Sequence, residues 1–277
     1  TYMTHTSLEK KALDDVSFTL EKGEFVALIG HTGSGKSTLA EHLNGLLHPM
    51  AGKVLVDGVD LAAKTAEAKA ARNRVGMVFQ YPEHQLFAET IYEDVAFGPR
   101  NQGKSELEVE EAVRSAMEFV DLDFDTFAQR SPFQLSGGQM RRVAIAGVVA
   151  MEPDYLIMDE PSAGLDPISR DSIFSQLQKI FEKRKMGVLL ITHSMEEAAQ
   201  YASRLLVMSD SRLQLDGPAR DLFTHEREKL EALSVDVPES VKLAEELRNQ
   251  GLPIEGTPLT KEELIRAIDR AKGWKTC

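Results

Sequence analysis

Gly30-His-Thr-Gly-Ser-Gly-Lys-Ser-Thr38 is the stretch around which the rest of the chain is organised. It follows the phosphate-loop pattern of a glycine, four free positions and then Gly-Lys-Ser. The preceding residues, Phe25–Ile29, are wholly apolar, as a buried parallel strand is. From Leu39 onward the sequence predicts a helix. The motif therefore stands between a strand and a helix, and it predicts an α/β fold that binds a nucleoside triphosphate.

The residue types of this loop suit phosphate chemistry. Its glycines let the backbone turn its N–H groups toward an anion, and the helix start adds further donors and a positive dipole end. Lys36 brings a positive charge to the outer phosphates, and the Ser37 hydroxyl can ligate Mg²⁺. The predicted nucleotide contacts are Gly30, His31, Thr32, Gly33, Ser34, Gly35, Lys36, Ser37 and Thr38. The alternative is a glycine-rich turn without a ligand, and the motif alone does not distinguish a kinase, a GTPase and a transport ATPase.

Composition restricts the class of protein. The chain has 277 residues, of which 42% are hydrophobic and 27% charged, as in a globular protein of one or two domains. The net charge of −12 argues against non-specific binding to nucleic acid or anionic lipid. The longest uncharged apolar run, Val143–Met151, is too short to cross a bilayer, so we expect any membrane link to go through a partner. Because the sequence starts at Thr1 rather than at a methionine, we expect further residues upstream.

Polar side chains follow three more predicted strands. Val75–Phe79 ends at Gln80, Tyr155–Met158 is followed by Asp159 and Glu160, and Val188–Thr192 is followed by His193. The carboxyl ends of parallel strands are where such sheets bind ligands. We expect Gln80 and Asp159 to act on Mg²⁺, Glu160 to polarise the attacking water, and His193 to contact the γ-phosphate.

A second anion-binding device follows a predicted helical insert. Leu135-Ser-Gly-Gly-Gln139 places a hydroxyl and glycine N–H groups at the start of a helix expected over Met140–Ala150. One nucleotide has no obvious use for two such devices in one subunit. We therefore expect ATP to lie between two subunits, with Ser136, Gly137, Gly138 and Gln139 serving the nucleotide of the partner.

The same patterns predict the domain organisation. Residues 1–220 form an ATPase domain, in which about 90–134 and the helix to about 150 are a helical subdomain, and 221–277 form a helical extension. Strands expected over Val16–Leu20 and Lys53–Val59 belong to an antiparallel β subdomain, where Tyr2 is a candidate to stack on adenine. The extension is either a dimerisation or regulatory element or a stabilising addition.

Taken together, these motifs resemble the nucleotide-binding subunit of ABC transporters over about residues 2–220. The Walker A loop, Gln80, the signature Leu135–Gln139, the Walker B acids, the loop Ser162–Asp166 and His193 follow one another in that family's order. The resemblance implies ATP and Mg²⁺ as cofactors, with Ser37, Gln80 and Asp159 at the metal. It also implies Glu160 as catalytic base, His193 as γ-phosphate sensor, Tyr2 at the adenine, and a P-loop fold with a mainly parallel sheet flanked by helices.

A narrower resemblance lies in Phe79-Gln-Tyr-Pro-Glu-His-Gln-Leu-Phe87 and Asp94-Val-Ala-Phe-Gly-Pro99. These stretches look like the ATPases of energy-coupling factor (ECF) importers, of the second, A-prime type. The family implies a paralogous ATPase in a heterodimer, a membrane coupling subunit (T) and a substrate-binding membrane subunit (S), with vitamins or transition-metal ions as cargo. A homodimer is the alternative. The chain would lie on the cytoplasmic face of the cell membrane and contact T around Gln80–Phe87, with Glu83 as a candidate partner for an arginine of T.

Three alternatives remain at this point. An importer fed by a soluble binding protein would keep the mechanism. A soluble ABC ATPase acting on nucleic acid or ribosomes would require a long coiled coil or a second cassette, and the acidic charge counts against it. A small-molecule kinase leaves the signature Leu135–Gln139 unexplained.

Overall fold

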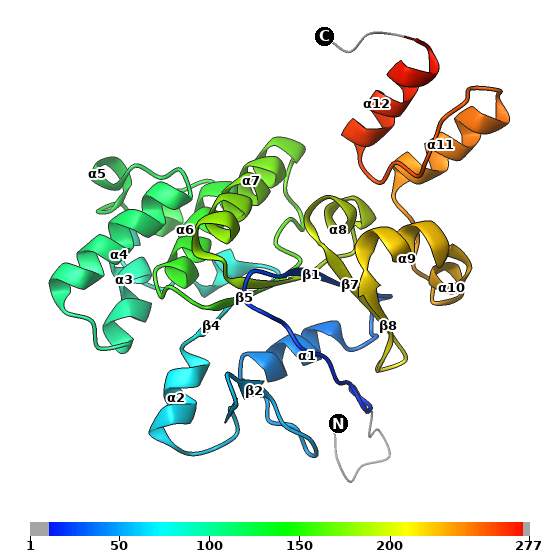
Figure 1. Ribbon diagram of the computed structural model, residues 1–277. Helices are drawn as coiled ribbons and strands as arrows, with labels where there is room; N and C mark the ends of the chain where they lie inside the picture. The colour runs from blue at the N-terminus through cyan, green and yellow to red at the C-terminus, as the bar shows by residue number, and fades with distance from the viewer. Residues whose placement is uncertain (1–10, 274–277) are drawn as a thin grey trace. The chain divides into compact units, whose positions relative to one another are not determined.

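In the computed structural model, residues 11–273 are described (Figure 1). Their contacts divide the chain into two units. The first, here called the P-loop unit, comprises residues 1–19, 25–36 and 190–277, and the second, the signature unit, comprises 20–24 and 37–189. The division of the chain near residue 220 remains a prediction.

The P-loop unit contains strands that carry the phosphate loop. Strand β1 (Phe25–Ile29) is fully buried and pairs in parallel with β7 (Arg204–Ser209), which pairs antiparallel with β8 (Arg212–Pro218). On the other side of β1 lies the end of β6 (Gly187–Ile191), whose earlier residues belong to the signature unit. Five helices complete the unit: α8 (Met195–Tyr201), α9 (Ala219–His225), α10 (Arg227–Ala232), α11 (Glu239–Asn249) and α12 (Lys261–Ala271).

Helices α11 and α12 form a hairpin with a small core of its own. Ala244, Ile254, Leu264 and Ala267 are buried together, and Leu247, Leu252 and Ile268 pack around them. The hairpin is drawn in orange and red in Figure 1. Thr260 caps α12 by accepting from the Glu263 N–H.

The signature unit is built on strands β4 (Val75–Val78) and β5 (Tyr155–Asp159), which pair in parallel, with β6 beside β5. Apolar residues fill these strands because a parallel sheet is buried on both faces. Helices α3, α4 and α6 pack against one another (Figure 1). The helices and 3₁₀ turns of this unit are α1 (Lys36–Leu43, whose first residue belongs to the other unit), α2 (Ala66–Arg72), η1 (Pro82–Gln85), α3 (Ile91–Asn101), α4 (Glu106–Phe119), α5 (Phe124–Phe127), η2 (Pro132–Gln134), α6 (Gly137–Val149) and α7 (Pro167–Arg184).

Two helices begin with the same capping geometry. Ser105 and Glu108 form a capping box at α4, and Ser136 and Gln139 form one at α6. In each box the serine accepts from the backbone three residues on, while the longer side chain accepts from the serine N–H. The second box makes the signature itself a helix start.

Two predicted strands differ in the structure. Lys53–Val59 is not one strand but part of a hairpin of β2 (Leu55–Val56) and β3 (Val59–Asp60). Asp57 and Gly58 between them have φ of +47° and +83°, the left-handed pair that a two-residue turn with right-handed strand twist requires. Val16–Leu20 alternates between half-buried and exposed residues as predicted, but it is not a strand.

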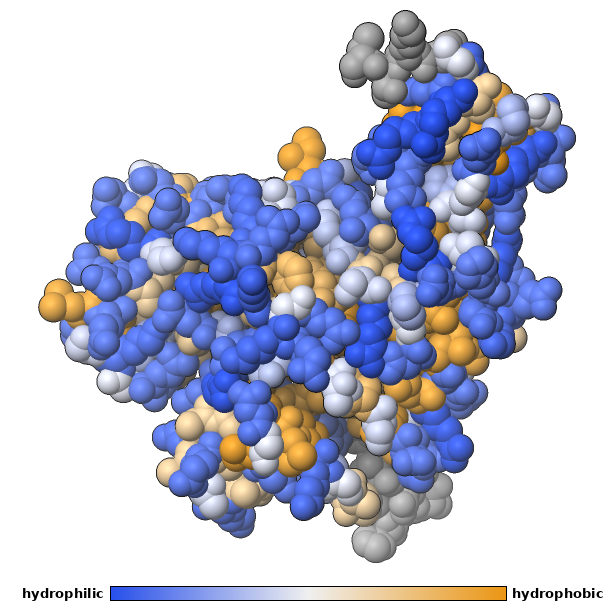
Figure 2. Space-filling view, in the orientation of Figure 1, coloured by the Kyte–Doolittle hydropathy of each residue, from blue (hydrophilic) through white to orange (hydrophobic). Residues whose placement is uncertain are grey.

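Figure 2 shows hydrophilic residues over most of the face in view, with hydrophobic residues in separate patches. No helix among residues 11–273 combines the length and the apolar character that crossing a membrane demands.

Candidate functional site

The phosphate loop of the P-loop unit takes a backbone path that requires glycine. Gly30, Gly33 and Gly35 have φ of +149°, +84° and +106°. A Cβ at Gly30 would lie 2.1 Å from the Met208 carbonyl oxygen, and one at Gly35 would lie 2.4 Å from that of Ala12. The loop is therefore pressed against its own unit, whereas a Cβ at Gly33 would stand in open space.

Two polar side chains of this loop indicate an anion site. Lys36 is 6% exposed, and its Nζ donates to the carbonyl oxygens of Gly30 at 2.8 Å and His31 at 3.1 Å. The buried Ser34 hydroxyl has no hydrogen-bond partner among the described residues. A buried hydroxyl is rarely left unsatisfied without a ligand or water. Together with the bare glycine N–H groups, these features fit the phosphates of ATP.

The remaining loop residues lie around this cradle. The His31 ring contacts the Thr32 carbonyl oxygen at 3.0 Å and the buried Ser209 hydroxyl at 3.3 Å. Ser37 is exposed and Thr38 half-buried, both in the first turn of α1. Tyr2 lies outside the described residues.

In the signature unit, Gln80 and Glu160 meet. Gln80 follows β4, Glu160 follows β5, and the parallel pairing of these strands brings their ends together. The Gln80 Nε2 donates to Glu160 Oε2 at 2.8 Å. This contact holds the carboxylate in one orientation.

The Walker B acids differ in their surroundings. Asp159, the last residue of β5, is 7% exposed, while Glu160 is half-buried. Glu160 has φ of +49°, so the chain turns sharply directly after the strand. Its carbonyl oxygen accepts from the Ala163 N–H at 3.1 Å, which closes that turn.

The signature lines a cavity of about 390 Å³ in the same unit. One wall is the amino end of α6, with Ser136, Gly137, Gly138 and Gln139, and another is the loop Ala163–Asp166. Asp166 caps α7 by accepting from the Ile168 and Ser169 N–H groups, and the Ser169 hydroxyl bond lowers the pKa of this carboxyl group. The cavity thus combines a helix amino terminus, glycine N–H groups and hydroxyls, the donors that an anion requires.

His193 is exposed and follows β6 in the P-loop unit. Hydrogen bonds of the neighbouring Thr192 hold this segment in place. The buried Thr192 hydroxyl donates to Glu197 Oε2 at 2.6 Å and accepts from the Ser194 N–H at 3.0 Å. Ser194 also caps α8 by accepting from the Glu197 N–H. Sequence reasoning missed Thr192 and Glu197, although a threonine and a glutamate on either side of a capped helix start were a usable signal.

Sequence reasoning also missed Arg141. This side chain is 2% exposed and donates to Glu83, to the Gln80 carbonyl oxygen and to the Ala163 carbonyl oxygen. Helical spacing puts position 141 on one face with the buried Ala144, Ile145 and Val149. An arginine on an apolar helix face was the signal for a buried charge with dedicated partners.

Glu83 has an ion-pair partner in its own chain. Its carboxylate is a candidate for an arginine of the T subunit, and it accepts from Arg141 Nε at 3.2 Å. The side chain is 19% exposed. The contact with T remains a prediction.

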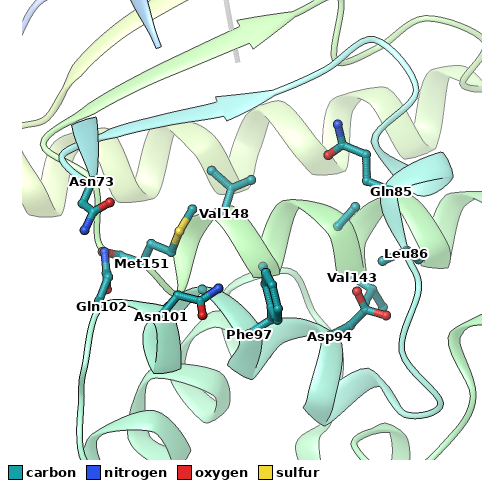
Figure 3. A pocket seen from close by; sticks show the side chains of 13 residues that line it. Asn73, Gln85, Leu86, Asp94, Phe97, Asn101, Gln102, Val143, Val148 and Met151 are labelled. Atoms are coloured by element: carbon teal, nitrogen blue, oxygen red, sulfur yellow. The ribbon is translucent and has the colours of Figure 1, made fainter. Parts of the chain in front are cut away.

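A second cavity of about 390 Å³ lies between η1, α3 and α6 (Figure 3). Apolar side chains line it together with Asp94 and four amides, the whole set being Asn73, Gln85, Leu86, Asp94, Phe97, Gly98, Asn101, Gln102, Val143, Ala144, Gly147, Val148 and Met151. At its edge the exposed Phe87 and Phe97 rings meet edge to face, with centroids 5.0 Å apart. Burial raises the pKa of Asp94, against two backbone hydrogen bonds from Ala88 and Phe87. We call this cavity the η1 groove.

Comparison with known proteins identifies the family. The family model described as ABC transporter matches residues 13–163, more than half of the chain. The energy-coupling factor transporter ATP-binding protein EcfA2 of Clostridium acetobutylicum is 50% identical over 98% of this chain and 96% of its own length.

Solved structures agree with this assignment. One is cbiO1 of Clostridium perfringens, described as part of the ABC transporter complex cbiONQ, with a TM-score of 0.70 and 33% identity over 80% of this chain and 88% of that one. Another is the ATP-binding cassette MJ0796, solved as a dimer bound to ADP and Pi, with a TM-score of 0.67 and 29% identity over 76% and 91% of the two chains. The α/β P-loop fold and the sequence resemblance are thereby confirmed, and the chain belongs to the EcfA2 family of ATP-hydrolysing subunits of energy-coupling factor ABC transporters.

Proposed function

We propose that this chain is one half of an ATP-driven clamp, paired with a paralogous ATPase, that powers uptake of vitamins or transition-metal ions. A homodimer is the alternative pairing. The observation that carries the proposal is the cavity formed by the signature and the loop Ala163–Asp166, a phosphate-binding device separate from the phosphate loop Gly30–Thr38. ATP bound by the phosphate loop of one subunit would be completed by Ser136, Gly137, Gly138 and Gln139 of the other. The dimeric MJ0796 cassette supports this arrangement.

The proposed reaction is hydrolysis of ATP to ADP and phosphate. Glu160 accepts a proton from water, the water oxygen bonds to the γ-phosphorus, and the bond to the ADP oxygen breaks. Gln80 holds Glu160 in place through its amide nitrogen. Lys36 leaves its loop carbonyls for the outer phosphates, His193 contacts the γ-phosphate, and Tyr2 stacks on the adenine.

Mg²⁺ would be held by Ser37, Gln80 and Asp159. These residues offer hydroxyl, amide and carboxylate oxygens, the ligand types that Mg²⁺ prefers. The ion would neutralise charge on the β- and γ-phosphates. The amide oxygen of Gln80 suits this role because its amide nitrogen already donates to Glu160.

We propose the η1 groove and the segment Gln80–Phe87 as the docking site of the T subunit, with the S subunit held in the same complex. The groove offers apolar walls, an exposed aromatic pair and the Asp94 carboxylate, which suit an amphipathic helix bearing a cation. Besides Glu83, which also pairs with Arg141, Asp94 is an acid that such a cation would meet. The chain would then lie at the cytoplasmic face of the cell membrane, without contact to nucleic acid.

The test is purification of the tagged, full-length chain from its native membrane in mild detergent. We expect a second ATPase of this family and two integral membrane proteins in stoichiometric amounts. Recovery with a permease fed by a soluble binding protein, or with ribosomes or nucleic acid, would overturn the proposal.

A further inference from the structure

Arg141 has a buried guanidinium group that bonds to three different segments of the signature unit. These segments are the end of β4 at Gln80, the turn η1 at Glu83 and the loop after Glu160 at Ala163. Its Nε donates to Glu83 Oε2 at 3.2 Å, Nη1 to the Ala163 carbonyl oxygen at 2.7 Å, and Nη2 to the Gln80 carbonyl oxygen at 2.6 Å. The side chain is 2% exposed. Burying a charge is costly unless it is paired and hydrogen-bonded, and these three acceptors meet that requirement.

Two of the acceptors, the carbonyl oxygens of Gln80 and Ala163, belong to residues that are hydrogen-bonded to Glu160. Gln80 is held by Arg141 through its carbonyl oxygen and holds Glu160 through its amide nitrogen. Ala163 is held by Arg141 through its carbonyl oxygen and donates its own N–H to the Glu160 carbonyl oxygen. Arg141 thus fixes both backbone segments from which the catalytic contact is made, without touching Glu160 in any contact that the structure describes.

The third acceptor links two surfaces. Glu83 lines the signature cavity together with Arg141, and it lies in η1, the 3₁₀ turn that contributes Gln85 to the η1 groove. A shift of η1 would move the Glu83 carboxylate relative to Arg141. Since the guanidinium is a rigid planar fork, it cannot follow Glu83 and keep both carbonyl contacts unchanged.

We propose that Arg141 is a positioning residue that sets the Gln80–Glu160 contact and makes it sensitive to occupation of the η1 groove. The first part concerns hydrolysis alone. The second part rests on the proposed function, because it requires a partner in the groove. Arg141 acts on Glu160 through Gln80 and Ala163. A movement of η1 acts on Arg141 through its contact with Glu83.

The test compares kcat and KM for ATP in R141K, E83Q and the double variant. Lysine keeps the charge but cannot reproduce three directed bonds from one plane. We expect kcat of R141K to fall on the order of 100-fold, the scale on which small misplacements of catalytic groups act. KM should stay within about twofold, because Arg141 lines the signature cavity but its three nitrogens already donate to protein acceptors. E83Q should lower kcat less, and the double variant should match R141K, because both changes break one network.

Control variants distinguish a positioning role of Arg141 from a purely structural role. E152Q removes a carboxylate that is ion-paired with Lys104 and Arg184 on the same unit, and it should leave kcat unchanged. Loss of thermal stability in R141K with wild-type kcat would overturn the proposal. If R141K fails to fold, E83Q decides alone, and an unchanged kcat in the assembled complex would refute the proposal.

The coupling part is measured as the ratio of hydrolysis rates with and without the membrane partners. We expect E83Q to reduce that ratio toward one while E152Q retains it. An unaltered ratio in E83Q would contradict the link to the η1 groove. If no membrane partner is found at all, the proposed function fails, but the kcat comparison on the ATPase subunits still decides the role of Arg141.

Discussion

Gln80 and Glu160 are 80 positions apart, yet the amide nitrogen of one donates to the carboxylate of the other at 2.8 Å. Parallel pairing of β4 with β5 brings the two strand ends together. Arg141 and the turn at Glu160 then hold the two loops. The contact shows that the protein's own groups orient the carboxylate. Preorganisation of this kind lowers the cost of reaching the transition state.

E160Q should lower kcat for ATP by roughly 10²–10⁴-fold, because the amide cannot accept the proton of the attacking water. ATP binding should survive, because glutamine has nearly the shape of glutamate and because the phosphate loop Gly30–Thr38 is unchanged. Single-turnover hydrolysis and equilibrium nucleotide binding measure the two effects. Wild-type turnover in E160Q would remove Glu160 from the role of base.

S136A should impair the nucleotide site whose phosphate loop lies on the other subunit. It should also lower stability by about 1 kcal/mol, because a capping serine is lost from α6. S105A removes the same kind of capping box from α4 and provides the matched control for stability, with no expected loss of hydrolysis. Mixed dimers with one variant subunit locate the affected site, and a loss confined to the variant's own phosphate loop would contradict the clamp.

D94N should stabilise the protein at neutral pH. Burial raises the pKa of Asp94, so the folded state keeps its proton to a higher pH than the unfolded chain does. The contribution of this carboxyl group to the free energy of unfolding therefore falls as pH rises above its ordinary value of about 4. Asparagine keeps an acceptor for the Ala88 and Phe87 N–H groups without the charge.

Thermal unfolding of D94N and wild type between pH 4 and 8 tests this sign. The gain should shrink as the pH falls toward 4, because burial makes the wild-type carboxyl group take up its proton more readily in the folded state. D123N is the control of opposite sign, because hydrogen bonds from Thr126 lower the pKa of Asp123, so removing that charge should destabilise the protein at neutral pH. A gain of D94N that is constant over the range would contradict the assignment.

F97S should weaken recovery of the T subunit with the tagged chain while leaving nucleotide binding intact. Phe97 is 52% exposed, lines the η1 groove and meets Phe87 edge to face, so its loss costs less folding energy than the loss of a buried aromatic side chain. L107S removes a more exposed apolar side chain from α4 that does not line the groove, and it should have no effect. Equal recovery of the membrane partner with both variants would place the docking surface elsewhere.

Local chemistry made much of this protein predictable from its residues. The phosphate loop, the capping box at Ser105 and the turn at Asp57-Gly58 each depend on residues a few positions apart. The same holds for the polar positions at strand ends, which periodicity and burial locate. Local rules were wrong about the length of one strand. They predicted a single strand over Lys53–Val59, where the chain forms a hairpin with a two-residue strand on each side of its turn.

Pairings across long stretches of chain required the folded structure. The contact of Glu83 with Arg141 joins residues 58 positions apart, and that of Gln80 with Arg141 joins residues 61 positions apart. Which acid meets which arginine depends on the register of β4 with β5 and on how α6 packs beside η1, and both result from burial summed over many side chains. The residue types at these positions permit several partners. Packing selects one because a buried charge is stable only where every one of its donors finds an acceptor.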